Sequence, residues 1–184
     1  MKHSTIAIVT LSLIIVACQG QTNIERGTYT EVGWMVYFPK NYNISDSLLI
    51  KKNSKSSSGF LKTLFAVRQK NYNSFVATIN PYESSKSSWE ESFEISKQIM
   101  IDQITNMGSN IKMIDTSSST ELIDKLKFLK FSLVTFYPVQ NLTLNTAVYY
   151  RKIGNHDLVI TVGYEDEIIG KEYKEILLKS KFEK

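Results

Sequence analysis

Cysteine, histidine and proline are scarce in this chain of 184 residues. It contains one cysteine, two histidines and three prolines. A single cysteine cannot form an internal disulfide, and a metal site with four cysteine and histidine ligands is excluded by counting alone. The eight glycines form no phosphate-binding loop and no dinucleotide fingerprint.

The chain also lacks a strong charge of one sign. Its formal net charge is only +4, and the basic residues are interspersed with acidic ones. No Lys/Arg stripe with interleaved aromatic residues is present, so nucleic acid is not an expected partner. Hydrophobic residues make up 42% of the chain and aromatic residues 11%. This composition predicts one ordinary globular domain with a proper core.

Long apolar runs are missing except near the start, where Ile6 to Ala17 carries no charge and follows Lys2. Twelve residues rise about 18 Å as a helix, which is too short for a bilayer core of about 30 Å. The run therefore predicts a signal peptide over residues 1–17.

The only cysteine follows this run directly. Ile15-Val16-Ala17-Cys18 resembles the bacterial lipobox, an aliphatic residue and two smaller ones before an invariant cysteine. The resemblance implies that the thiol of Cys18 is joined to diacylglycerol, that the leader is cut before it, and that the new amino terminus is acylated, palmitate being the expected label. An ordinary secretory peptide with a free thiol is the alternative. Residues 18–27 are then a lipidated polar tether. Gln19, in place of an inner-membrane-retaining Asp, implies the outer membrane, on its periplasmic or surface side.

Residues 28–184 are expected to form a single α+β domain. Two possible capping boxes, Ser87–Glu90 and Ser88–Glu91, predict the start of an amphipathic helix over Trp89–Met107. Asp166 is positioned to cap a last helix. Alternation, turn residues and apolar runs predict strands over 34–38, 47–51, 60–69, 74–80, 111–115, 121–124, 126–138, 146–153 and 156–166. The run Thr116–Thr120 is expected to be a turn.

This element order resembles the PsbP-like/Mog1-like superfamily, in which an antiparallel sheet is sandwiched by helices. The resemblance rests on Phe38-Pro39 with Tyr42 near the start, and on Ile176, Leu177 and the Ser180–Phe182 tail. Asn41-Tyr42 departs from the more usual Gly-aromatic pair. The resemblance implies accessory or binding roles without catalysis, and no partner-binding residue of the family can be matched here.

No catalytic set emerges, and no cofactor is expected. His156 is the only histidine after the leader and is interpreted as an exposed hairpin residue. Glu165-Asp166-Glu167 is interpreted as acidic residues at a helix start, which the helix dipole favours. The leading hypothesis is therefore a membrane-anchored, non-catalytic binding or accessory module of the bacterial envelope. A small carboxylate-dependent hydrolase and a surface-exposed structural or host-facing antigen are the alternatives.

Aromatic side chains near turns and element ends are the candidate contact surface for an envelope protein or peptide partner. Packing at the edge of a half-buried sheet is the alternative for the same rings. The residues are Tyr82, Trp89, Tyr137, Tyr149 and Tyr150.

Overall fold

The computed structural model describes residues 24–46, 49–50, 61–69, 72–82 and 88–183. The strands and helices follow in the order β1 (Ile24–Tyr29), β2 (Trp34–Pro39), β3 (Ile44–Asp46), β4 (Leu49–Ile50), β5 (Leu61–Arg68), β6 (Ser74–Pro81), α1 (Trp89–Asn106), the short 3-10 helix η1 (Gly108–Asn110), β7 (Lys112–Ile123), β8 (Leu126–Tyr137), β9 (Leu142–Ile153), β10 (His156–Tyr164), α2 (Glu167–Lys179) and β11 (Lys181–Phe182). Cys18 and Ser87 lie outside the described residues.

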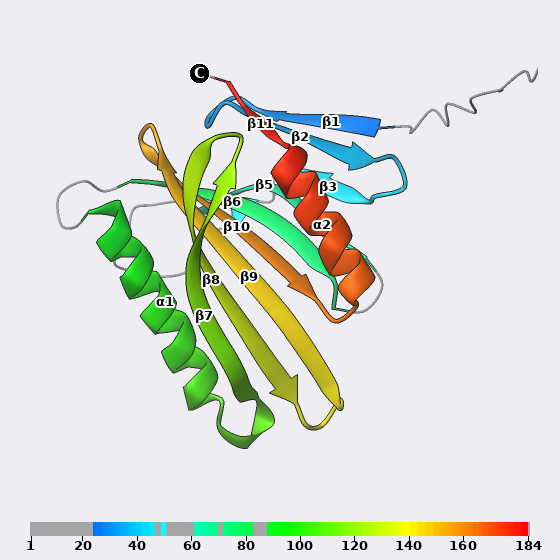
Figure 1. Ribbon diagram of the computed structural model, residues 1–184, viewed down its shortest axis with the longest axis vertical. Helices are drawn as coiled ribbons and strands as arrows, with labels where there is room; N and C mark the ends of the chain where they lie inside the picture. Colours follow the sequence, from blue (N-terminus) through cyan, green and yellow to red (C-terminus); the bar gives the residue numbers. More distant parts are fainter. Residues whose placement is uncertain (1–23, 47–48, 51–60, 70–71, 83–87, 184) are drawn as a thin grey trace, which may run out of the picture.

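An eight-stranded antiparallel sheet forms the centre of the molecule, in the order β3-β5-β6-β10-β9-β8-β7 with β4 also paired to β5. A second sheet has three strands in the order β1-β2-β11. Figure 1 shows the large sheet as a twisted layer, with β7 at one edge and the small sheet across one end. This is the expected α+β class with an antiparallel sheet.

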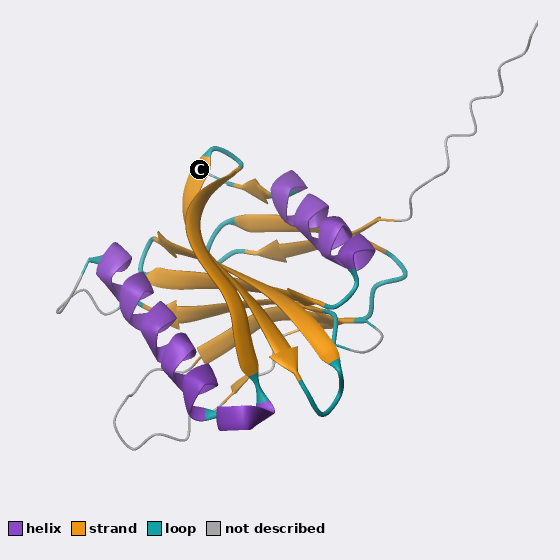
Figure 2. Ribbon diagram, turned by 60° about the horizontal axis from the view of Figure 1, so that its bottom comes forward, coloured by secondary structure: helices purple, strands orange, loops and turns teal. Residues whose placement is uncertain are grey.

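The two helices cover opposite faces of the large sheet, as Figure 2 shows. Tyr173, Ile176 and Leu177 of α2 belong to the main core, which also contains Tyr149 of β9. Phe93 of α1 belongs to a second core with Tyr150, the next residue of β9. Because successive strand residues point to opposite faces, the two cores lie on the two sides of one sheet.

Helix α1 begins where its capping signal predicts. The Ser88 side chain accepts a hydrogen bond from the backbone N–H of Glu91, and the Glu91 carboxylate accepts one from the backbone N–H of Ser88. Gly108, just after the end of this helix, has a φ of +63°, a conformation that glycine adopts without a steric penalty. Met100 and Ile104 pack on the second core, whereas Ile99 and Met107 are exposed. The apolar stripe is therefore narrower than the sequence suggests.

The small sheet begins earlier than the predicted domain boundary at residue 28. Ile24, Glu25 and Arg26 were expected to belong to the polar tether, but they pair with Pro39, Phe38 and Tyr37 as part of β1. An isolated edge strand of mixed polarity carries little periodic signal, which is why its start was missed. On the other side of β2, Phe182 pairs with Trp34.

Strand β7 also differs from the sequence expectation. Thr116–Thr120 is not a turn, because it continues the pairing of β7 with β8 from Lys112 to Ile123, with a register shift between Met113 and Asp115. Serine and threonine are typical of turns, yet a strand at a sheet edge can present them to water on both sides. The true reversal is Asp124-Lys125, two non-glycine residues with φ values of 46° and 68°, as a tight hairpin requires.

The Asp124 carboxylate holds the end of the chain in place. It accepts hydrogen bonds from the backbone N–H of Phe182 at 2.8 Å and from the Lys181 ammonium at 3.2 Å. Both donors favour the ionised carboxylate, the backbone bond most, and lower the pKa of Asp124.

We expect Asp124→Asn to reduce stability more at pH 7 than at pH 3. A carboxyl group with a lowered pKa stabilises the fold above its unfolded pKa of about 3.9 and loses that contribution as the pH falls through the folded pKa. Asparagine tolerates a positive φ, so the variant changes the charge without straining the turn. The measurement is the free energy of unfolding of both proteins at each pH, and an equal difference at pH 3 and pH 7 would contradict the prediction.

Candidate functional site

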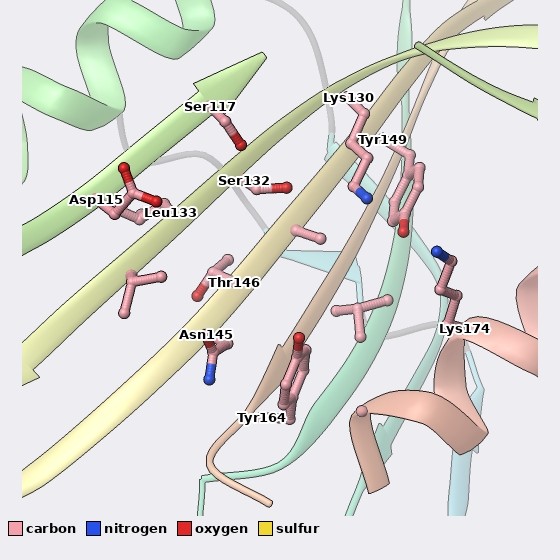
Figure 3. A pocket seen from close by; sticks show the side chains of 14 residues that line it. Asp115, Ser117, Lys130, Ser132, Leu133, Asn145, Thr146, Tyr149, Tyr164 and Lys174 are labelled. Atoms are coloured by element: carbon pink, nitrogen blue, oxygen red, sulfur yellow. The ribbon is translucent and has the colours of Figure 1, made fainter. Parts of the chain in front are cut away.

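A polar cavity of about 170 Å³ lies on the α2 side of the large sheet. It forms where α2 leaves the outer strands uncovered, and Figure 3 shows its lining side chains. Four strands and α2 contribute residues to it, namely Asp115, Ser117, Lys130, Ser132, Leu133, Val134, Asn145, Thr146, Ala147, Tyr149, Val162, Tyr164, Gly170 and Lys174.

Strand alternation explains why polar groups gather here. On β8, Lys130 and Ser132 lie between Phe128 and Val134 on the same face. Phe128 is fully buried in the main core, whereas Lys130 and Ser132 border the cavity. The sheet face therefore changes from apolar to polar along one strand. Lys130 and Ser132 are the signal in the sequence that one face of this strand is not wholly apolar.

Two lysines share one carboxylate at the edge of the cavity. The Nζ atoms of Lys130 and Lys174 lie 3.7 Å and 3.9 Å from Oε2 of Glu121. These distances are those of ion pairs rather than hydrogen bonds. The Lys130 ammonium also lies over the Tyr149 ring, 5.4 Å from its centroid. Two positive charges and one negative charge leave an excess of one positive charge at this end.

The tyrosines of the cavity remain protonated at neutral pH. Burial, with the nearby negative charge of Glu121, raises the pKa of Tyr149 to about 12. Burial also raises the pKa of Tyr164, and the charge of Glu167 adds to this effect. Both hydroxyl groups can therefore donate hydrogen bonds to a bound molecule.

Asp115 lies at the other end of the cavity, on β7. Figure 3 shows it on the far side from Lys130, Tyr149 and Lys174. Among the described residues it makes no side-chain hydrogen bond or ion pair, and the same holds for the hydroxyls of Ser117 and Ser132. The Asn145 amide donates one long hydrogen bond of 3.5 Å to Glu167. Several polar groups of the cavity thus keep their hydrogen-bonding capacity.

The five predicted aromatic residues do not form one surface. Tyr149 and Tyr150 are adjacent on β9 and point to opposite faces, with 2% and 4% of their surface exposed. Tyr149 lines the cavity, whereas Tyr150 packs beneath α1. Strand alternation therefore separates these two neighbours, and of the two only Tyr149 borders the cavity.

The other three predicted aromatics lie away from the cavity. The ring of Trp89 stacks on that of Tyr150, with centroids 6.2 Å apart. The Lys152 ammonium lies 3.6 Å from the centroid of the Tyr82 ring. Tyr137 is half-buried at the end of β8. Packing within the domain accounts for the Trp89 ring, in agreement with the alternative that these rings pack at the edge of the sheet.

The residues considered for catalysis or metal binding have local roles. Asp166 caps α2 by accepting a hydrogen bond from the backbone N–H of Ile168 at 2.8 Å, and His156 begins β10 opposite Ile153. Within the described ranges, no group of three or more His, Cys, Asp or Glu side chains is arranged to hold a metal ion. None of the helices in the same ranges combines the length and apolar character that crossing a bilayer requires.

Comparison with solved structures identifies a protein with a similar fold. The solution structure of cyanobacterial PsbP (CyanoP) from Synechocystis matches this chain with a TM-score of 0.57, covering 92% of this chain and 99% of that one. The fold is PsbP-like. Sequence identity to CyanoP is only 10%, so the likeness concerns the fold alone. No protein-family model matches the chain, and no curated protein matches it.

The residues that suggested the PsbP-like resemblance are structural. Ser180 is fully buried, and its Oγ accepts a hydrogen bond of 2.9 Å from Nε1 of Trp34. The Tyr42 hydroxyl donates a hydrogen bond of 2.9 Å to Glu172 of α2. Phe38 is fully buried beside Tyr42, with their ring centroids 6.4 Å apart. These residues fix the small sheet and α2 to each other.

Proposed function

We propose that this chain is a lipoprotein of the bacterial cell envelope whose domain is a non-catalytic binding or accessory module. Cys18 carries the lipid, and the protein is held at the outer membrane. The observation that carries the binding part of the proposal is the cavity. It places unpaired polar groups and separated charges on rigid strands, an arrangement suited to holding a small polar molecule.

The start of β1 supports the anchoring part. Strand β1 includes Ile24, and at most residues 19–23 separate this strand from Cys18. Five extended residues reach roughly 17 Å. A domain on so short a tether works close to the membrane surface. Multiple acyl chains supply a stable anchor, because each buried methylene contributes about 0.8 kcal/mol and one chain alone holds only marginally.

We expect Cys18→Ser to abolish labelling of the protein by radioactive palmitate and to accumulate uncleaved precursor. The matched control is Thr22→Ser, a change four residues further along that keeps Cys18 and should keep the label. Membrane fractionation of cells provides the second measurement, in which the wild type sediments with the outer membrane. Persistent labelling of Cys18→Ser would refute lipidation at this residue.

Enzyme assays separate the binding module from the alternative of a carboxylate-dependent hydrolase. The full chain, assayed against a panel of esterase, peptidase and glycosidase substrates, should show no turnover above that of a heat-denatured sample. Turnover that disappears in Asp115→Asn would instead support the hydrolase. Protease treatment of intact cells tests the remaining alternative of a surface-exposed protein.

A further inference from the structure

The cavity on the α2 side of the sheet has opposite charges at its two ends. Asp115 lies opposite Val134 in the register of β7 and β8, and Ser119 lies opposite Lys130. Val134 and Lys130 are four residues apart on one strand, which corresponds to about 13 Å along the sheet. Side chains of both residues line the same cavity. A bound molecule that meets both ends must therefore be elongated.

The positive end can accept a carboxylate. Glu121 holds neither Lys130 nor Lys174 at hydrogen-bonding distance, with separations of 3.7 Å and 3.9 Å. Only 18% of the Lys130 side chain is exposed, so a partner there interacts in a partly desolvated environment, where charge pairs are stronger. The protonated hydroxyl of Tyr149 lies at the same end and can donate a further hydrogen bond.

The negative end can accept an amine. The Asp115 carboxylate has no cation paired with it among the described residues. The Asn145 side chain extends the same end and reaches Glu167. An ammonium group bound here would find carboxylate and amide oxygens as acceptors.

The middle of the cavity suits peptide groups. Ser117 pairs with Ser132 across the two strands, and both residues line the cavity. Their hydroxyls can both donate and accept, as the N–H and C=O groups of a peptide require. The cavity, about 170 Å³ in volume and partly open to solvent, admits a short, slender molecule with small side chains.

We propose that the cavity binds a short peptide with free ends, about three residues long, whose carboxylate meets Lys130 and Lys174 and whose amino group meets Asp115. Three extended residues span roughly 10 Å, and a hydrogen bond of about 3 Å at each end extends this reach to about 16 Å, enough to cover the roughly 13 Å between the two strand positions. A single amino acid is too short to reach both ends.

Calorimetric titration of the full chain, purified in a non-ionic detergent, tests this with four probes: trialanine, its N-acetyl form, its C-terminal amide, and alanine. We expect trialanine to bind at least about tenfold more tightly than either blocked form, because each block removes a charge-assisted hydrogen bond. Alanine should bind more weakly still.

Two variants test which end of the cavity binds the amino group of the peptide and which end binds its carboxylate. Asp115→Asn should lose affinity for trialanine and no longer distinguish it from the N-acetyl form, while still discriminating against the amide. Lys174→Gln should show the reverse pattern. Lys171→Gln is the matched control, because Lys171 is an exposed lysine of the same helix that does not line the cavity. A folding defect in a variant would lower all affinities together and would not abolish one discrimination selectively.

Equal affinity for free and blocked peptides, or no binding of trialanine at millimolar concentration, would overturn the inference. Binding of glucose or inorganic phosphate in place of peptide would also overturn it. The inference rests on the proposed binding function, and different results would contradict the peptide inference and the proposed function. A silent titration leaves palmitate labelling of Cys18 intact, whereas hydrolysis of trialanine during the titration would refute the non-catalytic proposal itself.

Discussion

Replacing Trp34 by alanine is expected to lower the free energy of unfolding by about 3 to 5 kcal/mol, the usual cost of removing a large buried aromatic side chain. Trp34 is fully buried. Its ring stacks on Phe182 with centroids 5.7 Å apart and lies 5.6 Å from that of Phe65. The change would therefore open a cavity between the small sheet and the main core. Urea unfolding monitored by far-ultraviolet circular dichroism measures the effect.

The hydrogen bond from Trp34 to Ser180 can be tested separately. Ser180→Ala keeps the packing of the ring but leaves the buried Nε1–H without its acceptor, a loss of about 1 to 3 kcal/mol. Because the two residues are in contact, the double variant should cost less than the sum of the single ones. Full additivity, or a loss below about 1 kcal/mol for Trp34→Ala, would mean that this contact does not join the two parts of the fold.

Replacing Gly170 by alanine is expected to destabilise the protein by about 1 to 2 kcal/mol, although alanine is the better helix former. A Cβ atom at this position would lie 2.5 Å from Cδ2 and 2.7 Å from Cγ of Tyr164. Overpacking of this kind typically costs about 1 to 3 kcal/mol, whereas the gain in helix propensity is at most about 1 kcal/mol. The clash should therefore outweigh the propensity, and thermal unfolding measures the balance.

The sign of this effect should reverse when the ring is absent. In a Tyr164→Ala background the new Cβ meets no aromatic ring, and Gly170→Ala should then stabilise the protein through helix propensity alone. If Gly170→Ala still destabilised the protein in this background, a clash with Tyr164 would not be the cause. Gly170 and Tyr164 both line the polar cavity. Gly170→Ala alone should therefore also weaken binding there, because it displaces the Tyr164 ring.

The helices and most strands were predictable because their signals are local. The capping box at Ser88, the Asp166 cap and the alternation in β2 each depend on neighbours in sequence, and the structure confirms them. The edge strand β7 was not predictable in the same way. Its serines and threonines are compatible with a turn, and only pairing with β8 along its whole length makes them a strand.

The cavity could not be predicted from the sequence, because its residues come from five elements and match no motif. The topology of the sheet and the position of α2 bring Asp115 and Lys174 to opposite ends of the same cavity. The predicted aromatic surface is divided for a related reason. Tyr149 and Tyr150 look like one feature in the sequence, but adjacent residues of a covered strand belong to different cores.

The small sheet has a consequence for how the protein is made. Strand β2 lies between β1, near the beginning of the chain, and β11, near its end. The Trp34–Ser180 hydrogen bond joins residues 146 positions apart. As the chain folds, β2 must therefore wait beside an open core until Lys181 and Phe182 join it. Trp34 and Phe65 stay accessible to chaperones throughout that interval, and a chain cut short before β11 would lack the strand that closes this end of the core.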